Sequence, residues 1–245
     1  MRWVPSWLGL LYAQIYTRFG HAEFTTEEAK EAGGSSTNLN LALSRLASAG
    51  WIVRTKRGRY VAVEPLAALS GLANGWSDRF RDRTVFPCLE VAVGELFGLY
   101  GDRLVSLALF GSCARLDEGK TSDIDLLAVA RGVSDDYADR LKELRRVKDA
   151  TSRLRARQWL ESGEFHLVDV TVLKVDELAA NDVFLLDLTQ DAVVIFDRND
   201  TLKLALEKVR ERLRESRSRR VAAPSGSWYW ELKPVPDERQ RAHPP

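Results

Sequence analysis

The 245-residue sequence is poor in cysteine, methionine and histidine, with two, one and three copies. Two cysteines, Cys88 and Cys113, cannot form the disulfide framework of small secreted domains, so a reduced, cytoplasmic location is the simplest interpretation. No apolar run reaches the about 18 residues that a membrane-spanning helix needs. The apolar stretch at residues 3–16 is interrupted by Gln14 and lacks a small-residue cleavage site, so we predict a buried helix there and no membrane association.

An excess of charge of either sign is also missing. The 36 basic and 35 acidic residues give a net charge of +1, so the overall charge indicates no particular partner. The 45% hydrophobic and 29% charged content is typical of a soluble globular protein. The length fits one large or two small domains.

Two apolar runs joined by a polar loop form the most informative stretch. Leu-Ala-Leu-Phe-Gly-Ser at 107–112 is followed by ten residues and then by Asp-Ile-Asp-Leu-Leu-Ala-Val. Side chains alternate along a strand, so Asp123 and Asp125 point the same way, and two such carboxylates need a cation between them. Oxygen ligands suit Mg²⁺, while Gly111 and Ser112 can approach a phosphate closely. The stretch predicts a site for a metal-bound nucleoside triphosphate.

This motif resembles the nucleotidyltransferase superfamily that includes DNA polymerase beta. The matching residues are Phe-Gly-Ser at 110–112, Ala-Arg at 114–115 and Ser-Asp-Ile-Asp-Leu at 122–126. The pattern is most similar to the small MNT-type (minimal nucleotidyltransferase) branch, some members of which are antitoxins of HEPN toxins. The resemblance covers residues 90–197. That branch usually has glycine where this chain has Leu116, which leaves the path of the loop at 113–121 open.

The resemblance also implies roles for individual residues. The superfamily carries a third carboxylate on a neighbouring strand, and Asp169 lies within the apolar run at 165–173. An isolated acid there would cost several kcal/mol unless it is paired or bound to metal, and an ion pair with a nearby arginine is the alternative. His166 has the opposite parity and is predicted to be a packed histidine. The implied catalytic and metal-binding residues, for two Mg²⁺ ions, are Asp123, Asp125 and Asp169, and the implied nucleotide-binding residues, for ATP or another triphosphate, are Gly111, Ser112, Arg115 and Ser122.

The N-terminal part has the pattern of three helices followed by a hairpin. Apolar periodicity predicts a helix at 8–19, a capping box opens a second at Thr25, and a third starts at 35–37 and ends at Gly50. Two short strands follow within 51–63. Residues 8–63 resemble a winged helix-turn-helix.

Charge in this part favours nucleic-acid contact. Residues 33–63 contain no acid. In a winged helix the third helix enters the major groove and the wing contacts phosphates. A role in docking to protein is the alternative. The nucleic-acid candidates are Thr37, Asn38, Asn40, Arg45, Arg54, Lys56, Arg57 and Arg59.

The C-terminal part is basic and then aromatic. A helix from residue 201 to about 214 runs into a group of arginines and lysines, which three glutamates partly offset. The tail carries Trp228, Tyr229 and Trp230, which can stack on a base or, as we expect, pack against the rest of the protein.

We therefore predict an α+β protein, in which a small mixed sheet flanked by helices forms the transferase domain. The predicted parts are a winged helix-turn-helix domain at 1–66, a connector at 67–89, a nucleotidyltransferase domain at 90–222 and a tail at 223–245.

Two functions from different classes fit this organisation. The first is a Mg²⁺-dependent enzyme that transfers a nucleoside monophosphate, AMP from ATP, to a hydroxyl of a protein or RNA acceptor, a HEPN-type toxin being one such protein. The alternative is a DNA-binding regulator whose transferase domain senses nucleotide. The third acid, Asp169, favours the enzyme, because a sensor needs only the pair. The acceptor, the preferred base and the oligomeric state, including a homodimer, are not determined by the sequence.

Overall fold

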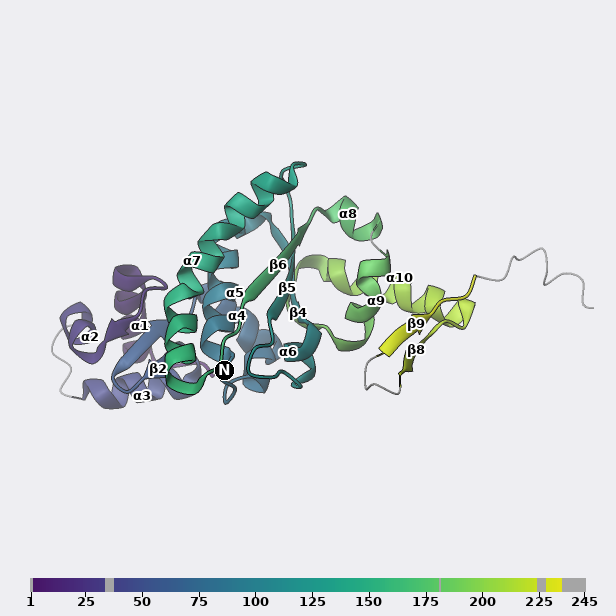
Figure 1. Ribbon diagram of the computed structural model, residues 1–245. Helices are drawn as coiled ribbons and strands as arrows, with labels where there is room; N and C mark the ends of the chain where they lie inside the picture. The colour runs from purple at the N-terminus through teal and green to yellow at the C-terminus, as the bar shows by residue number, and fades with distance from the viewer. Residues whose placement is uncertain (1, 34–37, 181, 224–227, 235–245) are drawn as a thin grey trace, which may run out of the picture.

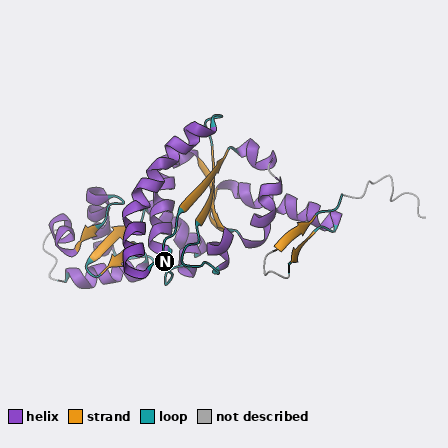
Figure 2. Cartoon of the chain, viewed as in Figure 1, coloured by secondary structure: helices purple, strands orange, loops and turns teal. Residues whose placement is uncertain are grey.

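The computed structural model describes residues 2–33, 38–180, 182–223 and 228–234 (Figure 1). The N-terminal helices lie at one end, a sheet covered by helices forms the middle, and a short hairpin lies at the other end (Figures 1 and 2). The prediction of a mixed α and β protein is confirmed. Among the described residues, no helix is both long enough and apolar enough to span a membrane.

The N-terminal part contains the predicted helices and hairpin. In chain order its elements are α1 Ser6–Phe19, β1 Phe24–Thr25, α2 Thr26–Gly33, α3 Leu39–Ala49, β2 Ile52–Lys56 and β3 Arg59–Ala62. The three strands form an antiparallel sheet in the order β1-β3-β2. The capping box is confirmed, because the Thr25 N–H donates to Glu28 Oε2 at 2.7 Å and the Glu28 N–H donates to Thr25 Oγ1 at 3.2 Å. The predicted start of the third helix, at 35–37, lies outside the described residues.

The segment interpreted as a connector folds into helices. These are α4 Pro65–Asn74 and the 3-10 turn η1 Trp76–Arg79. Glu64 caps α4 by accepting the Ala67 N–H at 2.7 Å, and Pro65 occupies the first turn, where its missing N–H costs nothing. One continuous hydrophobic core includes residues from α1, α4 and the central sheet.

The central sheet has four strands in the order β6-β5-β4-β7. β5 runs parallel to β6, whereas β4 is antiparallel to both β5 and β7, so the sheet is mixed as predicted. The elements of this part are α5 Phe86–Tyr100, η2 Gly101–Arg103, β4 Leu104–Phe110, α6 Gly111–Arg115, β5 Ile124–Ala130, α7 Tyr137–Ser162, β6 Val168–Leu173, α8 Val175–Ala180, α9 Asp182–Asp191, β7 Val193–Asp197, η3 Arg198–Asp200 and α10 Thr201–Ser216.

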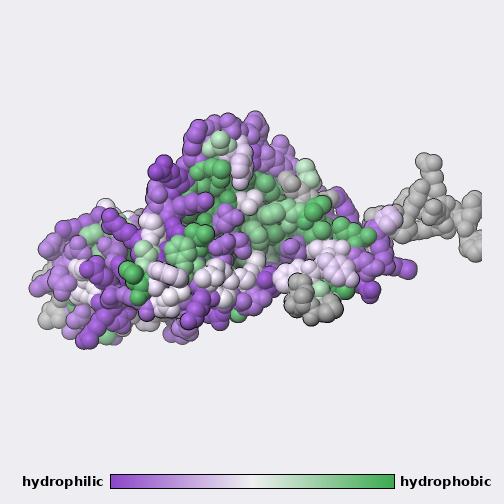
Figure 3. All heavy atoms as spheres, viewed as in Figure 1, coloured by the Kyte–Doolittle hydropathy of each residue, from purple (hydrophilic) through white to green (hydrophobic). Residues whose placement is uncertain are grey.

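Helices cover both faces of this sheet. Alternate strand side chains such as Leu126 and Ala128 share a core with α5 and α7. Leu127 and Val129 point the other way and share a second core with α8, α9 and α10. On the face drawn in Figure 3, apolar side chains gather between α7 and α9, where Figure 1 shows the sheet. Strand parity therefore decides which layer each side chain faces.

The chain ends in a two-stranded hairpin of β8 Arg219–Ala222 and β9 Trp228–Glu231. It lies beyond the C-terminal end of α10 (Figure 1). Its Trp230 indole N–H donates to Asp187 Oδ1 of α9 at 2.8 Å. The hairpin thus packs against the sheet-covering helices, as we expected for the aromatic tail.

Candidate active site

Asp125 and Asp169 lie opposite each other on neighbouring parallel strands. Asp125 is the second residue of β5 and is in register with Asp169, the second residue of β6. Paired residues of adjacent strands point to the same face of a sheet. Asp125 shares its parity with Leu127, so both acids lie on the face that α8, α9 and α10 cover, at the end of the sheet where β5 and β6 begin.

Gly111 makes room for Asp125. It follows β4 with φ +72°, a conformation that glycine adopts at little cost. A Cβ on Gly111 would lie 2.1 Å from Asp125 Oδ2, well inside contact distance. The sequence predicts a close approach of this glycine to a phosphate, and that stays a prediction; the close neighbour in the structure is the carboxylate of Asp125.

Negative charge is concentrated around Asp125. Burial first, and then the negative charges of Asp123 and Asp169, raise the pKa of the Asp125 carboxyl to about 6, while the positive charge of Arg115 opposes them. Asp123 immediately precedes β5 and is exposed, as is Asp169. The three acids are therefore near enough to repel one another, which is the situation that a bound cation relieves.

The donor set fits Mg²⁺ in its chemistry. All three side chains offer carboxylate oxygens, which that ion prefers. Among the described residues, no three acidic, histidine or cysteine side chains already stand in a metal-ligating arrangement. The exposure of Asp123 and Asp169 leaves both carboxylates free to turn toward an ion.

The loop after Gly111 takes a path that glycine would favour. Helix α6 is one short turn, and Leu116 ends it in the left-handed conformation, with φ 63° and ψ 26°. This is the position at which the MNT-type pattern has glycine. Leu116 therefore adopts a backbone conformation that favours glycine. Its Cβ is strained in this conformation, which destabilises the fold by about 1–2 kcal/mol.

The predicted nucleotide-binding residues lie in or beside this loop. Ser112 is half-buried in the first turn of α6. Ser122 Oγ accepts the Gly119 N–H at 2.9 Å, so this hydroxyl closes the turn before β5.

Arg115 is held by three neighbours. Its Nε lies 3.0 Å from Asp117 Oδ2, its Nη1 lies 3.3 Å from Asp191 Oδ2, and its guanidinium stacks 4.5 Å from the ring centre of Trp228. The C-terminal hairpin, through Trp228, is thus in contact with the loop that follows Gly111. Asp191 and Trp228 could not be assigned here from sequence, because each lies far from Arg115 along the chain.

Two buried side chains fix the backbone beside Asp123. The Cys113 thiol donates to the Asp123 carbonyl at 3.1 Å, and burial raises the thiol pKa to about 12, so it stays protonated. His166 Nδ1 lies 2.8 Å from the Ser122 carbonyl, and its side chain is buried as predicted. Both residues hold the start of β5 in place.

Two arginines to which sequence analysis assigns no role, Arg79 and Arg83, also hold this loop. Arg83 Nε pairs with Glu118 at 2.7 Å and its Nη2 donates to the Leu116 carbonyl at 3.0 Å. Arg79 donates to the Ala114 carbonyl at 3.4 Å. The alternation of arginines at 79, 81 and 83 was the only sequence signal for these contacts.

The nucleic-acid candidates of the N-terminal part fall into two groups. Asn38, Asn40 and Arg45 are exposed on or next to α3, and Arg54 and Arg57 are exposed on the hairpin. Thr37 lies outside the described residues.

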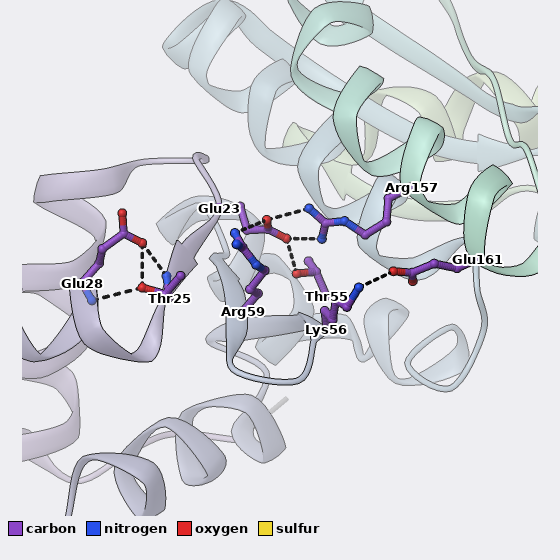
Figure 4. A network of polar contacts seen from close by, with 8 residues as sticks. All are labelled: Glu23, Thr25, Glu28, Thr55, Lys56, Arg59, Arg157 and Glu161. Carbon is purple, nitrogen blue, oxygen red and sulfur yellow. Dashed lines mark hydrogen bonds and ion pairs between the residues drawn. The ribbon is translucent and has the colours of Figure 1, made fainter.

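Lys56 and Arg59 form ion pairs within the chain (Figure 4). Lys56 Nζ lies 2.7 Å from Glu161 Oε1 of α7, and Arg59 Nη1 lies 3.2 Å from Glu23 Oε2. Arg157 of α7 holds the same Glu23 through both guanidinium nitrogens. The hairpin of β2 and β3 therefore directs part of its positive charge toward α7.

Comparison with known proteins identifies a protein family that matches part of the chain. Residues 92–174 match the nucleotidyltransferase domain family. No curated protein matches the sequence. Among the similar solved structures are three whose alignments each cover 49% of this chain. They are chains from a toxin-antitoxin complex with AMP-PNP (17% identity, 82% of that chain, TM-score 0.30), the toxin-antitoxin MntA-HepT (16%, 79%, 0.31), and a tri-AMPylated Shewanella oneidensis HEPN toxin in complex with MNT antitoxin (16%, 82%, 0.27).

Structural similarity at these low TM-scores does not indicate a shared mechanism. The family match stands on its own, and it spans β4, the Gly-Ser turn and both acid-bearing strands. The chain therefore carries a nucleotidyltransferase domain, as its sequence predicted.

Proposed function

We propose that this protein is a Mg²⁺-dependent nucleotidyltransferase that moves AMP from ATP to an acceptor hydroxyl. The observation that carries the proposal is the placement of Asp125 opposite Asp169, with Gly111 leaving space for the Asp125 carboxylate. The raised pKa of Asp125 supports it, because burial and the neighbouring charges of Asp123 and Asp169 disfavour its ionised form, and a shared cation would stabilise that form.

Each acid has a proposed role. Asp123 and Asp125 hold the cation against the triphosphate, and the turn at Gly111 and Ser112 holds the β- and γ-phosphates. Arg115 and Ser122 lie beside this turn and are assigned to the nucleotide. Asp169 orients the acceptor hydroxyl and takes its proton.

The bond changes follow from these positions. The acceptor oxygen attacks the α-phosphorus, the bond from that phosphorus to the bridging oxygen breaks, and pyrophosphate leaves. Bound Mg²⁺, as two ions, supplies charge stabilisation to the attacking and leaving oxygens. The protein contributes mainly position, because phosphoryl transfer needs little covalent chemistry from side chains.

The test is calorimetric titration of ATP and the other three triphosphates with Mg²⁺. We expect the wild type to bind in a metal-dependent way and Asp123→Ala/Asp125→Ala to lose that binding. Asp102→Ala, which removes an exposed acid from η2, is the charge control and should bind like the wild type. Absence of binding to the wild type would refute the proposal.

The acceptor is proposed as a hydroxyl of a protein, such as a tyrosine of a HEPN-type toxin, or of RNA. An α-labelled triphosphate incubated with the protein and each acceptor class distinguishes them by the product that carries the label. The proposal of a protein acceptor is supported only by the resemblance of the sequence motif to the MNT-type branch.

We also propose that residues 1–66 are a winged helix whose hairpin docks onto α7. The ion pairs of Lys56 and Arg59 support this role, because they use charges that a DNA-binding wing would give to phosphates. Asn40 and Arg45 are exposed on α3, where they could contact DNA. A DNA-binding regulator is therefore the second candidate function. Mobility shift with duplex DNA, on wild type and Asn40→Ala/Arg45→Ala, separates the two.

A further inference from the structure

The second half of α10 and the C-terminal hairpin enclose a pocket lined by arginines. Its volume is about 570 Å³. The lining residues come from α9, α10, the turn after α10 and both strands of the hairpin, and they include Arg210, Arg214, Arg217, Arg219, Arg220 and Trp230. No acidic side chain belongs to this lining among the described residues.

The positive charge of this pocket is only partly neutralised. Arg210 and Arg214 share Glu207, with contacts of 3.4 and 2.7 Å, and Arg219 pairs with Glu231 at 2.9 Å. Arg217 is exposed in the left-handed turn that ends α10. Because several guanidiniums share few carboxylates, the pocket attracts an anion with more than one charged group.

An aromatic ring is fixed beside these guanidiniums. Trp230 lines the pocket, and Asp187 holds its indole N–H at 2.8 Å. Arginines along a groove together with a fixed aromatic ring are how proteins hold unpaired strands of nucleic acid. A free phosphate would use only part of this surface.

Direct contacts link the pocket to Arg115, in the short helix that follows Gly111. Arg220 lines the pocket and lies 2.7 Å from Asp191, which also pairs with Arg115. The ring of Trp228 contacts the same two arginines, with its centre 4.7 Å from the Arg220 guanidinium and 4.5 Å from that of Arg115. Arg115 in turn acts on the carboxyl of Asp125. A ligand in the pocket would therefore contact Arg220, which shares Asp191 and Trp228 with Arg115 of the candidate active site.

We propose that this arginine pocket binds the phosphodiester backbone of a single-stranded polynucleotide, whose terminal hydroxyl is the acceptor. The binding part stands on the pocket alone, and the acceptor part rests on the transfer proposed above. RNA and DNA share the backbone chemistry that the pocket recognises, so the experiment compares the two.

The experiment measures fluorescence polarisation of 5′-labelled single-stranded RNA and DNA oligonucleotides over a range of salt concentrations. The test variant is Arg214→Gln/Arg217→Gln. The matched control is Arg131→Gln/Arg145→Gln, which removes two exposed arginines away from the pocket. Inorganic pyrophosphate, titrated separately, shows whether the pocket takes a simple anion instead.

We expect the wild type and the control to bind one or both strands, and the test variant to bind at least about tenfold more weakly. Its plot of log affinity against log salt should be shallower by about 1.4, because each phosphate contact on a single strand contributes roughly 0.7. Wild type that binds neither strand, equal binding by the test variant, or pyrophosphate binding without strand binding would each overturn the proposal.

A transfer assay separates this inference from the proposed function. Asp123→Ala/Asp125→Ala should bind the strand normally but should not transfer label to it. Label on a protein acceptor, with no strand binding, would refute the pocket and leave the transferase standing. Strand binding without label on the strand would refute the acceptor part and retain the binding part.

Discussion

Gly111→Ala tests whether the glycine is required by the backbone or by Asp125. The substitution imposes left-handed strain of about 1–2 kcal/mol at φ +72°. It also places a methyl group 2.1 Å from Asp125 Oδ2. The carboxylate can rotate away from that methyl group, so we expect most of the second effect to appear in ligand binding.

Gly75→Ala is the matched control. Gly75 ends α4 with φ +71°, and a Cβ there would have no atom within 4 Å. It therefore measures the backbone strain alone. Chemical denaturation should give similar losses in the free energy of unfolding for both variants.

Calorimetry with Mg²⁺ and ATP should then separate them. We expect Gly75→Ala to bind like the wild type and Gly111→Ala to bind at least about tenfold more weakly, a loss of about 1.4 kcal/mol or more. Equal binding by the two variants would refute the reasoning that Gly111 exists to seat the Asp125 carboxylate. A much larger loss of stability in Gly111→Ala would show that the carboxylate cannot move aside.

Three further predictions concern stability. Leu116→Gly should be more stable than Leu116→Ala by about 1 kcal/mol in denaturant unfolding, because only glycine relieves the left-handed strain; equal stabilities would argue against strain. Arg157, by hydrogen bonding, lowers the pKa of Glu23 to about 2, so this carboxylate stabilises the fold above pH 4.5 and the effect is lost as pH falls toward 2. Glu23→Gln should cost on the order of 2 kcal/mol at pH 7, and the difference from wild type should shrink in acid; a constant difference would contradict the ion pair. Arg83→Ala should cost about 2 kcal/mol by leaving Glu118 without its partner, and adding Glu118→Gln should recover part of that loss.

The sequence by itself determined the local geometry of the site. Alternation along strands places Asp123 and Asp125 on one side, and the parity of the apolar run places Asp169 on the side opposite to that of His166. These conclusions need only the chemistry of neighbouring residues. The helix at 65–74 could also have been predicted, because Glu64 and Pro65 are a capping residue and a first-turn proline.

Only the tertiary structure decided which distant groups meet. Strand register brings Asp169 against Asp125, and packing of α9 and the C-terminal hairpin brings Asp191 and Trp228, respectively, to Arg115. It also decided that Lys56 pairs with Glu161, whereas Arg57 stays exposed. The physical reason is that the partner of a charged side chain depends on which groups the folded chain brings near it. Periodicity in the sequence does not encode contacts between segments so far apart.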